Sequence, residues 1–165
     1  MDIEIRAALP AEYEELGALT AQAYRGDGLL DFEEGEGYQQ LLRDVAGRAR
    51  AGEVLVAAAG GTLLGTVTFA APGSPLADIS GPAEAEFRML AVAPAGRGRG
   101  AGEALVRACL ARSRALEGVT HVVLSTQRSM RAARRLYERI GFVRTPERDW
   151  DPVPGLTLLT YRMEL

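Results

Sequence analysis

The residues best suited to do chemistry lie in one short glycine-rich segment. Residues 96–102 read Gly-Arg-Gly-Arg-Gly-Ala-Gly. Glycine lets the backbone approach an anion closely, so that successive N–H groups can converge on its oxygens. A helix that begins directly after such a loop adds about half a positive charge at its N-terminus. Arg97 and Arg99 add charged donors, and the segment therefore predicts a site for a phosphate group.

The distribution of charge along the chain favours the same interpretation. The 165 residues include 22 acidic and 19 basic ones, which gives a net charge of −3, and every basic residue is an arginine. Residues 1–87 hold 5 arginines and 15 acidic residues, whereas residues 88–148 hold 13 arginines and 4 glutamates. A basic segment within an acidic chain can attract a phosphorylated ligand without making the whole chain bind nucleic acid. We therefore expect no nucleic-acid partner.

Two nucleotide-binding motifs are alternatives for this loop. A Walker-type phosphate loop requires a lysine, and the sequence contains none, so that motif is excluded. The pattern Gly96-x-Gly98-x-x-Ala101, with Glu117 farther along, fits a dinucleotide fingerprint. That fingerprint belongs after the first strand of a repeated strand–helix–strand sheet, whereas a long stretch of chain precedes the strand here. A nucleotide-binding redox protein is therefore the weaker alternative.

The sequence gives little support for a metal centre. Cys109 is the only cysteine and His121 the only histidine. These counts exclude an internal disulfide, a zinc site of cysteines and histidines, and a two-histidine site. Carboxylates alone remain as ligands for a cation such as Mg²⁺, and we expect no metal.

The elements that must position these residues follow from the hydrophobic pattern. Strands are predicted at residues 3–5, 53–59, 62–70, 85–92, 121–126, from 142 onward and at 156–163, and helices at residues 11–24, 38–50, 100–116 and 131–140. Gly60-Gly61 fits a two-residue hairpin turn. The order β-α-α-β-β-β-α-β-α-β-β predicts a mixed α/β fold in which a central sheet of about seven strands is flanked by about four helices. No repeat or linker divides the chain, so residues 1–165 are expected to form a single domain.

The chain shows no feature of a membrane or exported protein. No apolar run approaches the roughly 20 residues that a membrane-spanning helix needs. The N-terminal residues 1–6 include acids where a secretory signal would have a basic flank and an apolar stretch. We therefore expect a cytoplasmic protein with no membrane segment.

Two motifs in the basic segment resemble those of the GNAT superfamily of N-acetyltransferases. The first comprises Leu90-Ala91-Val92, Pro94 and Arg97-x-x-Gly100-x-Gly102, and is similar to the acetyl-CoA motif of that family. The second is Leu136-Tyr137, three residues, then Gly141-Phe142. Over residues 86–143 the resemblance is carried by specific motifs. Over the rest of the chain only the order of helices and strands is similar. The sequence departs from the family at Met130, where many members have an asparagine.

The resemblance implies a GNAT-like fold and an enzyme that uses acetyl-CoA as co-substrate. It would acetylate a primary amine by direct attack in a ternary complex. In this family two central strands splay apart, the pantetheine arm pairs with the first of them, and the pyrophosphate lies on the loop amides. The residues that would bind acetyl-CoA are Leu90, Ala91, Val92, Arg97, Gly98, Arg99, Gly100, Ala101, Gly102 and Tyr137. A catalytically silent acyl-CoA sensor of the same fold is a second alternative.

Two side chains are candidates for the proton transfers. An amine is mostly protonated at pH 7, so its acetylation favours a carboxylate as proton acceptor. Glu86 occupies a position where several family members carry the glutamate that acts as general base. Glu84, two residues earlier on the same face of the strand, is the alternative. Tyr137 matches the tyrosine that many members use as general acid toward the departing thiolate.

The acceptor site is expected beside the first two helices, which usually form its wall in this family. The segment that connects them is acidic, and its candidates for attracting a cationic amine are Asp31, Glu33 and Glu34. Trp150 is a further candidate for lining this site or for anchoring a loop to the core. We expect the acceptor to be an amine of a small molecule or of a protein. The sequence is compatible with a homodimer as well as with a monomer.

Overall fold

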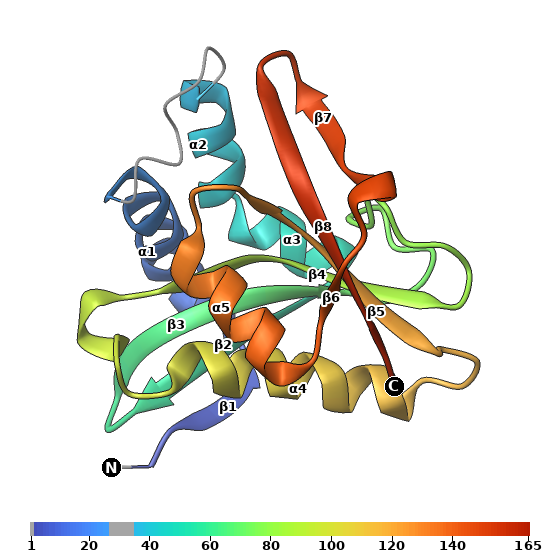
Figure 1. The fold of residues 1–165 in the computed structure, drawn as a ribbon. Helices are drawn as coiled ribbons and strands as arrows, with labels where there is room; N and C mark the ends of the chain where they lie inside the picture. Colours follow the sequence, from blue (N-terminus) through green and yellow to red (C-terminus); the bar gives the residue numbers. More distant parts are fainter. Residues whose placement is uncertain (1, 27–34) are drawn as a thin grey trace.

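The computed structural model describes residues 2–26 and 35–165, which form one twisted sheet covered by helices (Figure 1). The strands are β1 (Glu4–Ala7), β2 (Glu53–Ala59), β3 (Thr62–Ala70), β4 (Glu84–Val92), β5 (His121–Gln127), β6 (Val143–Arg144), β7 (Trp150–Val153) and β8 (Leu156–Glu164). The α-helices are α1 (Tyr13–Gly26), α2 (Gly35–Arg43), α3 (Val45–Ala51), α4 (Ala101–Ala115) and α5 (Arg131–Ile140). Short 3-10 helices lie at Pro10–Glu12, Pro94–Gly96 and Pro146–Arg148.

The sheet is antiparallel except at its centre. Its strand order is β1-β2-β3-β4-β5-β8-β6, and β7 pairs with β8 beside this path. Within the described parts of the chain, β4 and β5 are the one parallel pair. A parallel pair needs a crossover connection, and here α4 supplies it.

Both faces of the central sheet are buried, as β2 shows. Leu55 and Ala57 pack into the large hydrophobic core that also contains residues of α4 and α5. Val54 and Val56 point the other way and pack with Leu16 of α1 and with α3. Figure 1 shows the same arrangement, with α4 and α5 on one face of the sheet and α1, α2 and α3 beyond the other. The strand is therefore apolar at every position from Val54 to Ala59 instead of alternating with polar residues.

The single helix expected at residues 38–50 is wrong, because the chain breaks at Asp44 into α2 and α3. Asp44 leaves the helical region (φ −81°, ψ 66°), and its carboxylate accepts a hydrogen bond of 3.0 Å from the backbone N–H of Gly47. The buried Arg48 side chain donates to two backbone carbonyls in the last turn of α2, at 2.8 and 3.0 Å. These bonds satisfy the polar groups that a helix break would leave without partners.

The C-terminal part also differs from the expectation. The strand predicted from residue 142 onward is only the two-residue β6, after which Pro146 begins a 3-10 helix. The chain then forms β7, which the sequence pattern did not predict, and β7 and β8 make an antiparallel hairpin. The mixed α/β architecture is confirmed, with one more strand and one more helix among the described residues than expected.

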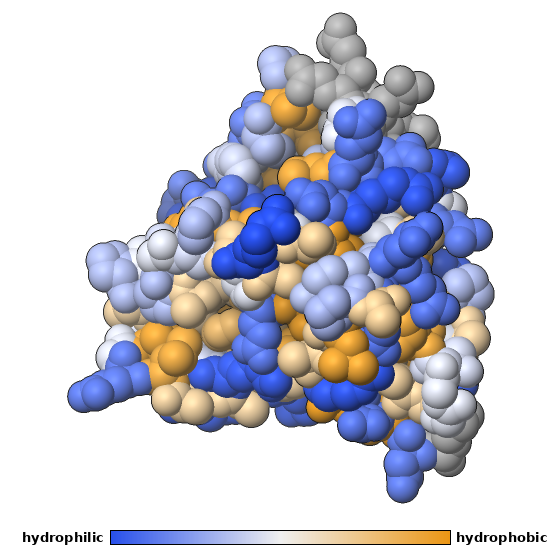
Figure 2. Space-filling view, turned by 180° about the vertical axis from the view of Figure 1, so that it is seen from behind, coloured by the Kyte–Doolittle hydropathy of each residue, from blue (hydrophilic) through white to orange (hydrophobic). Residues whose placement is uncertain are grey.

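The molecular surface mixes polar and apolar side chains. On the face seen in Figure 2, apolar areas are scattered among polar ones instead of forming one continuous patch. In the described ranges, no helix is both long enough and apolar enough to span a bilayer.

Candidate functional site

The centre of the sheet opens because β4 and β5 separate partway along their length. They pair only from Glu84 with His121 to Glu86 with Val123. Beyond this point β5 continues to pair with β8 as far as Gln127, and β4 continues to pair with β3 as far as Val92. Among the described residues, the edge of β4 that faces β5 therefore has no strand partner from Phe87 to Val92, as the family resemblance implied.

A bulge in β4 lies at the start of this open edge. Between Thr66–Thr68 of β3 and Arg88–Ala91 of β4 the register shifts, so that β4 carries an extra residue. Met89 has a φ of 57°, which is uncommon for any residue other than glycine. Its side chain is buried in a small cluster with Ala21, Tyr24 and Leu42, and this packing holds the strained backbone. A bulge redirects the residues that follow it, here those from Leu90 onward.

The glycine-rich loop connects β4 to α4 in the form that the sequence predicted. Gly98 and Gly100 have φ values of 71° and 83°, in the left-handed region where a side chain is strained. Gly100 is the N-cap residue of α4, and no side chain caps the helix there. The first N–H groups of α4 and its positive dipole end are thus available to an anion.

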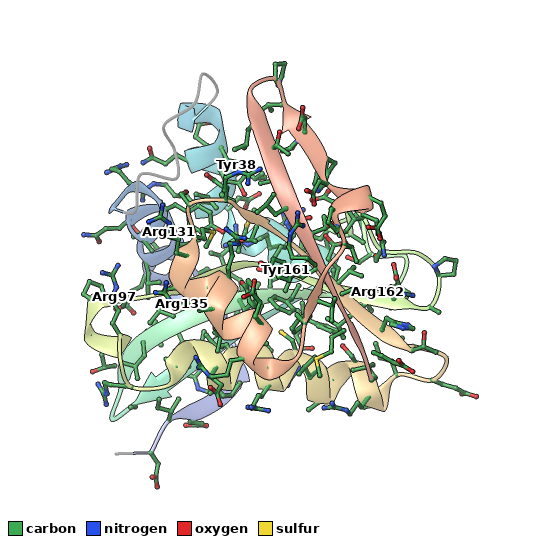
Figure 3. All side chains as sticks on the ribbon, in the orientation of Figure 1. Tyr38, Arg97, Arg131, Arg135, Tyr161 and Arg162 are labelled. Atoms are coloured by element: carbon green, nitrogen blue, oxygen red, sulfur yellow. The ribbon has the colours of Figure 1, made fainter. Side chains whose placement is uncertain are left out.

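A cavity of about 670 Å³, which we call the loop cavity, lies between this loop and α5. The residues predicted to bind acetyl-CoA that line it are Leu90, Ala91, Val92, Arg97, Gly98, Gly100, Ala101 and Gly102. Arg99 does not line it and instead donates a hydrogen bond of 3.1 Å to the backbone carbonyl of Ala95. Arg131 and Arg139 of α5 complete the basic side of the cavity. Figure 3 shows Arg97, Arg131 and Arg135 on the same side of the molecule, at the loop and along α5.

A second cavity of about 470 Å³, the cleft cavity, lies at an earlier part of β4, from Glu86 to Met89. Its walls are α2 and the β7–β8 hairpin, which stand opposite each other in Figure 1. Glu86, Arg88 and Met89 of β4 line its floor, and Trp150 lies on the hairpin wall. The Trp150 indole N–H donates to the Ser125 hydroxyl at 3.0 Å, so this side chain both lines the cavity and anchors its strand.

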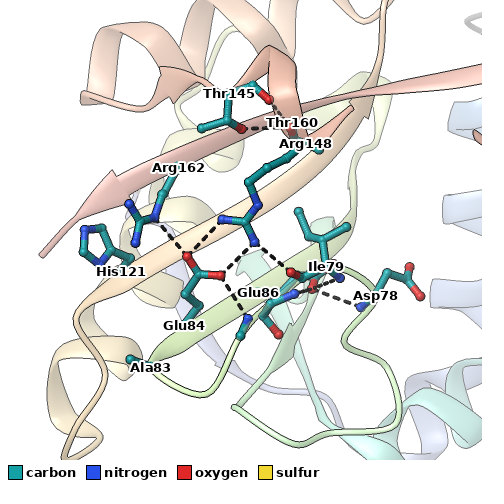
Figure 4. Close-up of polar contacts among 12 residues, drawn as sticks. Asp78, Ile79, Ala83, Glu84, Glu86, His121, Thr145, Arg148, Thr160 and Arg162 are labelled. Atoms are coloured by element: carbon teal, nitrogen blue, oxygen red, sulfur yellow. Dashed lines mark hydrogen bonds and ion pairs between the residues drawn. The ribbon is translucent and has the colours of Figure 1, made fainter. Parts of the chain in front are cut away.

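Glu86 is held in a fixed position at the floor of the cleft cavity. Its Oε1 accepts hydrogen bonds from three successive backbone N–H groups, those of Asp78 (3.0 Å), Ile79 (3.0 Å) and Ser80 (3.1 Å) (Figure 4). Only 1% of its surface is exposed, and this burial raises the pKa of the Glu86 carboxyl above its ordinary value. The three N–H groups oppose that rise in pKa and stabilise the charged form.

Glu84 has a different environment, although it lies on the same face of β4. Arg148 donates to both of its oxygens at 2.8 and 3.0 Å, and Arg162 donates to Oε2 at 2.9 Å (Figure 4). The hydrogen bonds from Arg148 are the main reason that the pKa of Glu84 falls to about 2. Glu84 lines neither cavity. A carboxylate bound by two guanidinium groups is a weak base, so the geometry favours Glu86 over Glu84 for proton transfer.

Glu84 should instead stabilise the fold, and the substitution Glu84→Gln tests this. The folded-state pKa is lower than the unfolded one, so the stabilisation is fully present above about pH 4.5 and is lost as the pH falls toward 2. We expect Glu84→Gln to lower the free energy of unfolding by about 3 kcal/mol at pH 7. Urea unfolding of both proteins at pH 7 and pH 3 measures the difference in their free energies of unfolding. The same difference at both pH values would contradict a stabilising role of the Glu84 charge.

Tyr137 lies where the two cavities approach each other. A small space of about 20 Å³ is lined by Tyr137 and by Tyr24 and Met130, and the latter two residues line both larger cavities. The ring of Tyr137 packs with Phe87, Phe142 and Tyr161 at centroid distances of 5.9 to 6.1 Å. Burial raises the pKa of the Tyr137 hydroxyl, which keeps it protonated.

Two further sets of residues were singled out from the sequence. Asp31, Glu33 and Glu34 lie outside the described residues. Cys109 is buried in the main core, where burial raises the pKa of its thiol. Among the residues that the structure describes, no three histidine, cysteine or acidic side chains group as a metal site would require.

Sequence reasoning missed part of the site. Among the residues it did not assign, Tyr38, Arg88 and Met89 line the cleft cavity, and Tyr24 and Met130 line both cavities. Tyr24, Tyr38, Arg88 and Met89 lie in ordinary helical or strand patterns and carry no motif. The alternation from Glu84 through Glu86 to Arg88 was the one available signal, because it places Arg88 on the face of Glu86.

Comparison with known proteins agrees with the family resemblance that the sequence motifs and the site geometry indicate. A family model described as the acetyltransferase (GNAT) family matches residues 14–142. A search of curated proteins gave no match. The match, together with a sheet that is mostly antiparallel, argues against the dinucleotide-binding alternative.

Solved structures show that the fold is that of this family. An acetyltransferase of the GNAT family from Staphylococcus aureus Mu50 has a TM-score of 0.77 at 15% identity, with 99% of each chain covered. The putative acetyltransferase yncA from Salmonella typhimurium, solved with its cofactor acetyl-CoA, has a TM-score of 0.66 at 19% identity, covering 100% of this chain and 95% of that one. The PaiA N-acetyltransferase from Thermoplasma acidophilum, solved with coenzyme A, has a TM-score of 0.72 at 17% identity, covering 99% of this chain and 100% of that one. The chain therefore belongs to the acetyltransferase (GNAT) family.

Proposed function

We propose that this protein transfers the acetyl group of acetyl-CoA to a primary amine, with both substrates bound at once. The observation that carries the proposal is the placement of the two cavities at successive parts of β4, one at Glu86 to Met89 and the other at Leu90 to Val92. They share Tyr24 and Met130 and meet beside Tyr137. A thioester entering from the loop cavity and an amine entering from the cleft cavity would meet there, which is the arrangement that direct attack requires.

The loop cavity fits the phosphates of acetyl-CoA. The loop N–H groups of Gly98 and Gly100 and the uncapped start of α4 suit a pyrophosphate. The N–H groups of Arg97 and Arg99 already donate to the carbonyls of Pro94 and Gly96 at 3.3 Å. Arg131 and Arg139 are near enough to the cavity to meet the phosphate at the adenosine end, although Arg139 also pairs with Glu103 at 2.9 Å. The Salmonella and Thermoplasma proteins, which share this fold, were solved with acetyl-CoA and coenzyme A.

The open edge of β4 would hold the pantetheine arm. Leu90, Ala91 and Val92 line the loop cavity, and β5 no longer pairs with β4 at these positions. Their backbone groups on that side can hydrogen-bond to the amides of an extended ligand, as in strand addition. The bulge at Met89 directly precedes Leu90, and the Leu90 N–H would stabilise the charge that develops on the thioester oxygen.

Glu86 would accept the proton of the attacking amine. Acetyl-CoA supplies an activated acyl group, but the amine needs a free electron pair before it can attack. Glu86 lines the cleft cavity, its orientation is fixed by three N–H groups, and its raised pKa suits a general base better than the low pKa of Glu84 does. The proton passes to the carboxylate directly or through water.

Tyr137 would donate a proton to the departing thiolate. A protonated phenol is a suitable donor, and Tyr137 is one of the residues that line the small space beside the two cavities. Its ring is fixed by three aromatic neighbours, so its hydroxyl is positioned before substrates bind.

The substitution Tyr137→Phe tests this role, because it keeps the ring packing and removes only the hydroxyl. A thiolate with an ordinary pKa near 8.5 leaves with little assistance, so we expect kcat to fall only about tenfold at pH 7. The affinity for acetyl-CoA should not change in a calorimetric titration. Unchanged kcat would show that Tyr137 serves packing alone.

The activity itself is tested by measuring thiol release from acetyl-CoA across a panel of primary amines. We expect release that depends on both the amine and the enzyme, with the acetylated amine detected by mass spectrometry. Tight binding of acetyl-CoA without release for any amine would contradict the proposal and identify the chain as a silent acyl-CoA sensor.

A further inference from the structure

We propose that the acceptor is a primary amine attached to an apolar body, either an alkyl chain or an aryl ring, and that it carries no anionic group beside the amine. This inference rests on the function proposed above and assigns the acceptor class for the cleft cavity. Three features of that cavity support it: an apolar hairpin wall, an exposed apolar residue opposite, and the charge on the floor.

The hairpin presents an apolar face to the cleft cavity. Trp150 pairs across the strands with Leu158, and Val153 pairs with Leu156. Residues that pair across two strands share one face of the hairpin, and all four line the cavity. On the opposite face, the Thr157 hydroxyl donates to the Asp151 carboxylate at 2.6 Å, and both residues are exposed. The hairpin is therefore amphipathic, with its apolar side toward the cavity.

This apolar face does not serve the protein core. Within the described residues, the three hydrophobic clusters include none of Trp150, Val153, Leu156 and Leu158. Leu41 of α2 lines the opposite wall, and 46% of its surface is exposed. Apolar side chains that line a groove without packing into a core are typical of a ligand-binding surface. An apolar body between the two walls would cover them.

The charge at the floor of the cavity selects a cation and disfavours an anion. Among the residues that the structure describes, three charged ones line the cavity: Asp78, Glu86 and Arg88. Arg88 pairs with Asp78 at 2.9 Å and also donates to the backbone carbonyl of Leu76 at 3.0 Å. The hydrogen bonds to Glu86 described above come from backbone N–H groups, and among the ion pairs of the described residues none includes its carboxylate. An ammonium group complements Glu86, whereas a carboxylate would be repelled.

Binding can be measured apart from catalysis because Trp150 is the only tryptophan in the chain. Its fluorescence should report an occupant of the cleft cavity. For butylamine, hexylamine and octylamine, we expect the Kd to fall about two- to fourfold per added CH₂ until the cavity is filled. The Kd of 2-phenylethylamine should be at least tenfold lower than that of L-phenylalanine, which differs by a carboxylate. The Kd of hexylamine should likewise be at least tenfold lower than that of 6-aminohexanoate, which carries an additional carboxylate.

Two adjacent substitutions provide a matched control. Leu156→Ser shortens a side chain on the cavity face, and we expect it to weaken hexylamine binding about tenfold. Thr157→Ser changes the opposite face and should leave hexylamine binding unchanged. Acetyl-CoA binding should be normal in both variants, which verifies that each is folded.

The outcomes separate this inference from the proposed function. Tight binding of apolar amines without thiol release would support the acceptor class and contradict acetyl transfer. Thiol release that is as fast with L-phenylalanine, 6-aminohexanoate or a polar peptide N-terminus as with apolar amines would support acetyl transfer and overturn the acceptor class. A Kd that does not change along the alkylamine series would also overturn it.

Discussion

Glu86→Gln should lower kcat/KM about 100-fold at pH 7, because it removes the group that accepts the proton from the amine. The glutamine carbonyl can still accept the three N–H groups of residues 78–80, so the loop should keep its position. The difference in kcat/KM between the variant and the unchanged protein should become smaller as the pH rises toward the pKa of the amine, near 10. At high pH the amine is already deprotonated and needs no base. Initial rates from pH 6 to pH 10 measure this effect.

Glu84→Gln is the matched control, since it makes the same chemical change two residues away on the same strand face. It should lower stability while kcat/KM at a permissive temperature stays close to that of the unchanged protein, because Glu84 lines neither cavity. Equal activity in Glu86→Gln and the unchanged protein across the pH range would remove Glu86 from the mechanism. A pH-dependent loss of kcat/KM in Glu84→Gln but not in Glu86→Gln would indicate that Glu84 is the general base.

Gly100→Val is expected to raise the Kd for acetyl-CoA roughly 100-fold. Gly100 has a φ of 83°, which a β-branched residue adopts only with strain. Relief of that strain moves the loop, and the N–H groups after Gly100 no longer converge on a phosphate. Loss of even one hydrogen bond to a charged group weakens binding roughly 10- to 100-fold. Calorimetric titration with acetyl-CoA measures the change.

Gly118→Val controls for the strain itself. Gly118 has a φ of 81°, and a Cβ at either glycine would meet no atom within 4 Å. It lies between α4 and β5 and lines neither cavity. Both substitutions should therefore lower the Tm, but only Gly100→Val should weaken acetyl-CoA binding. Equal affinities in the two variants would contradict the assignment of the loop as the phosphate site.

The parts of the fold that could be predicted from sequence are those that local chemistry determines. The hairpin at Gly60-Gly61 and helix α5 (Arg131–Ile140) have the predicted residues because turn glycines and a period of 3.6 are local signals. The loop at residues 96–102 was likewise identified by composition, and its glycines adopt the positive φ values that such a loop needs.

The parts that could not be predicted depend on contacts between distant segments. The break at Asp44 is stabilised by Arg48, whose Nε also donates to Thr68 of β3 at 3.1 Å. The bulge at Met89 is held by packing against α1 and α2, and no residue type marks it. The apolar face of the β7–β8 hairpin follows from the register of the two strands, which a short and turn-rich sequence does not specify.

The central claim is that the loop between β4 and α4 binds acetyl-CoA. It is tested most directly by calorimetric titration of the folded protein with acetyl-CoA. We expect saturable binding with one molecule per chain, and its loss in Gly100→Val but not in Gly118→Val. Absence of heat with acetyl-CoA, under conditions where circular dichroism shows the protein folded, would contradict the account.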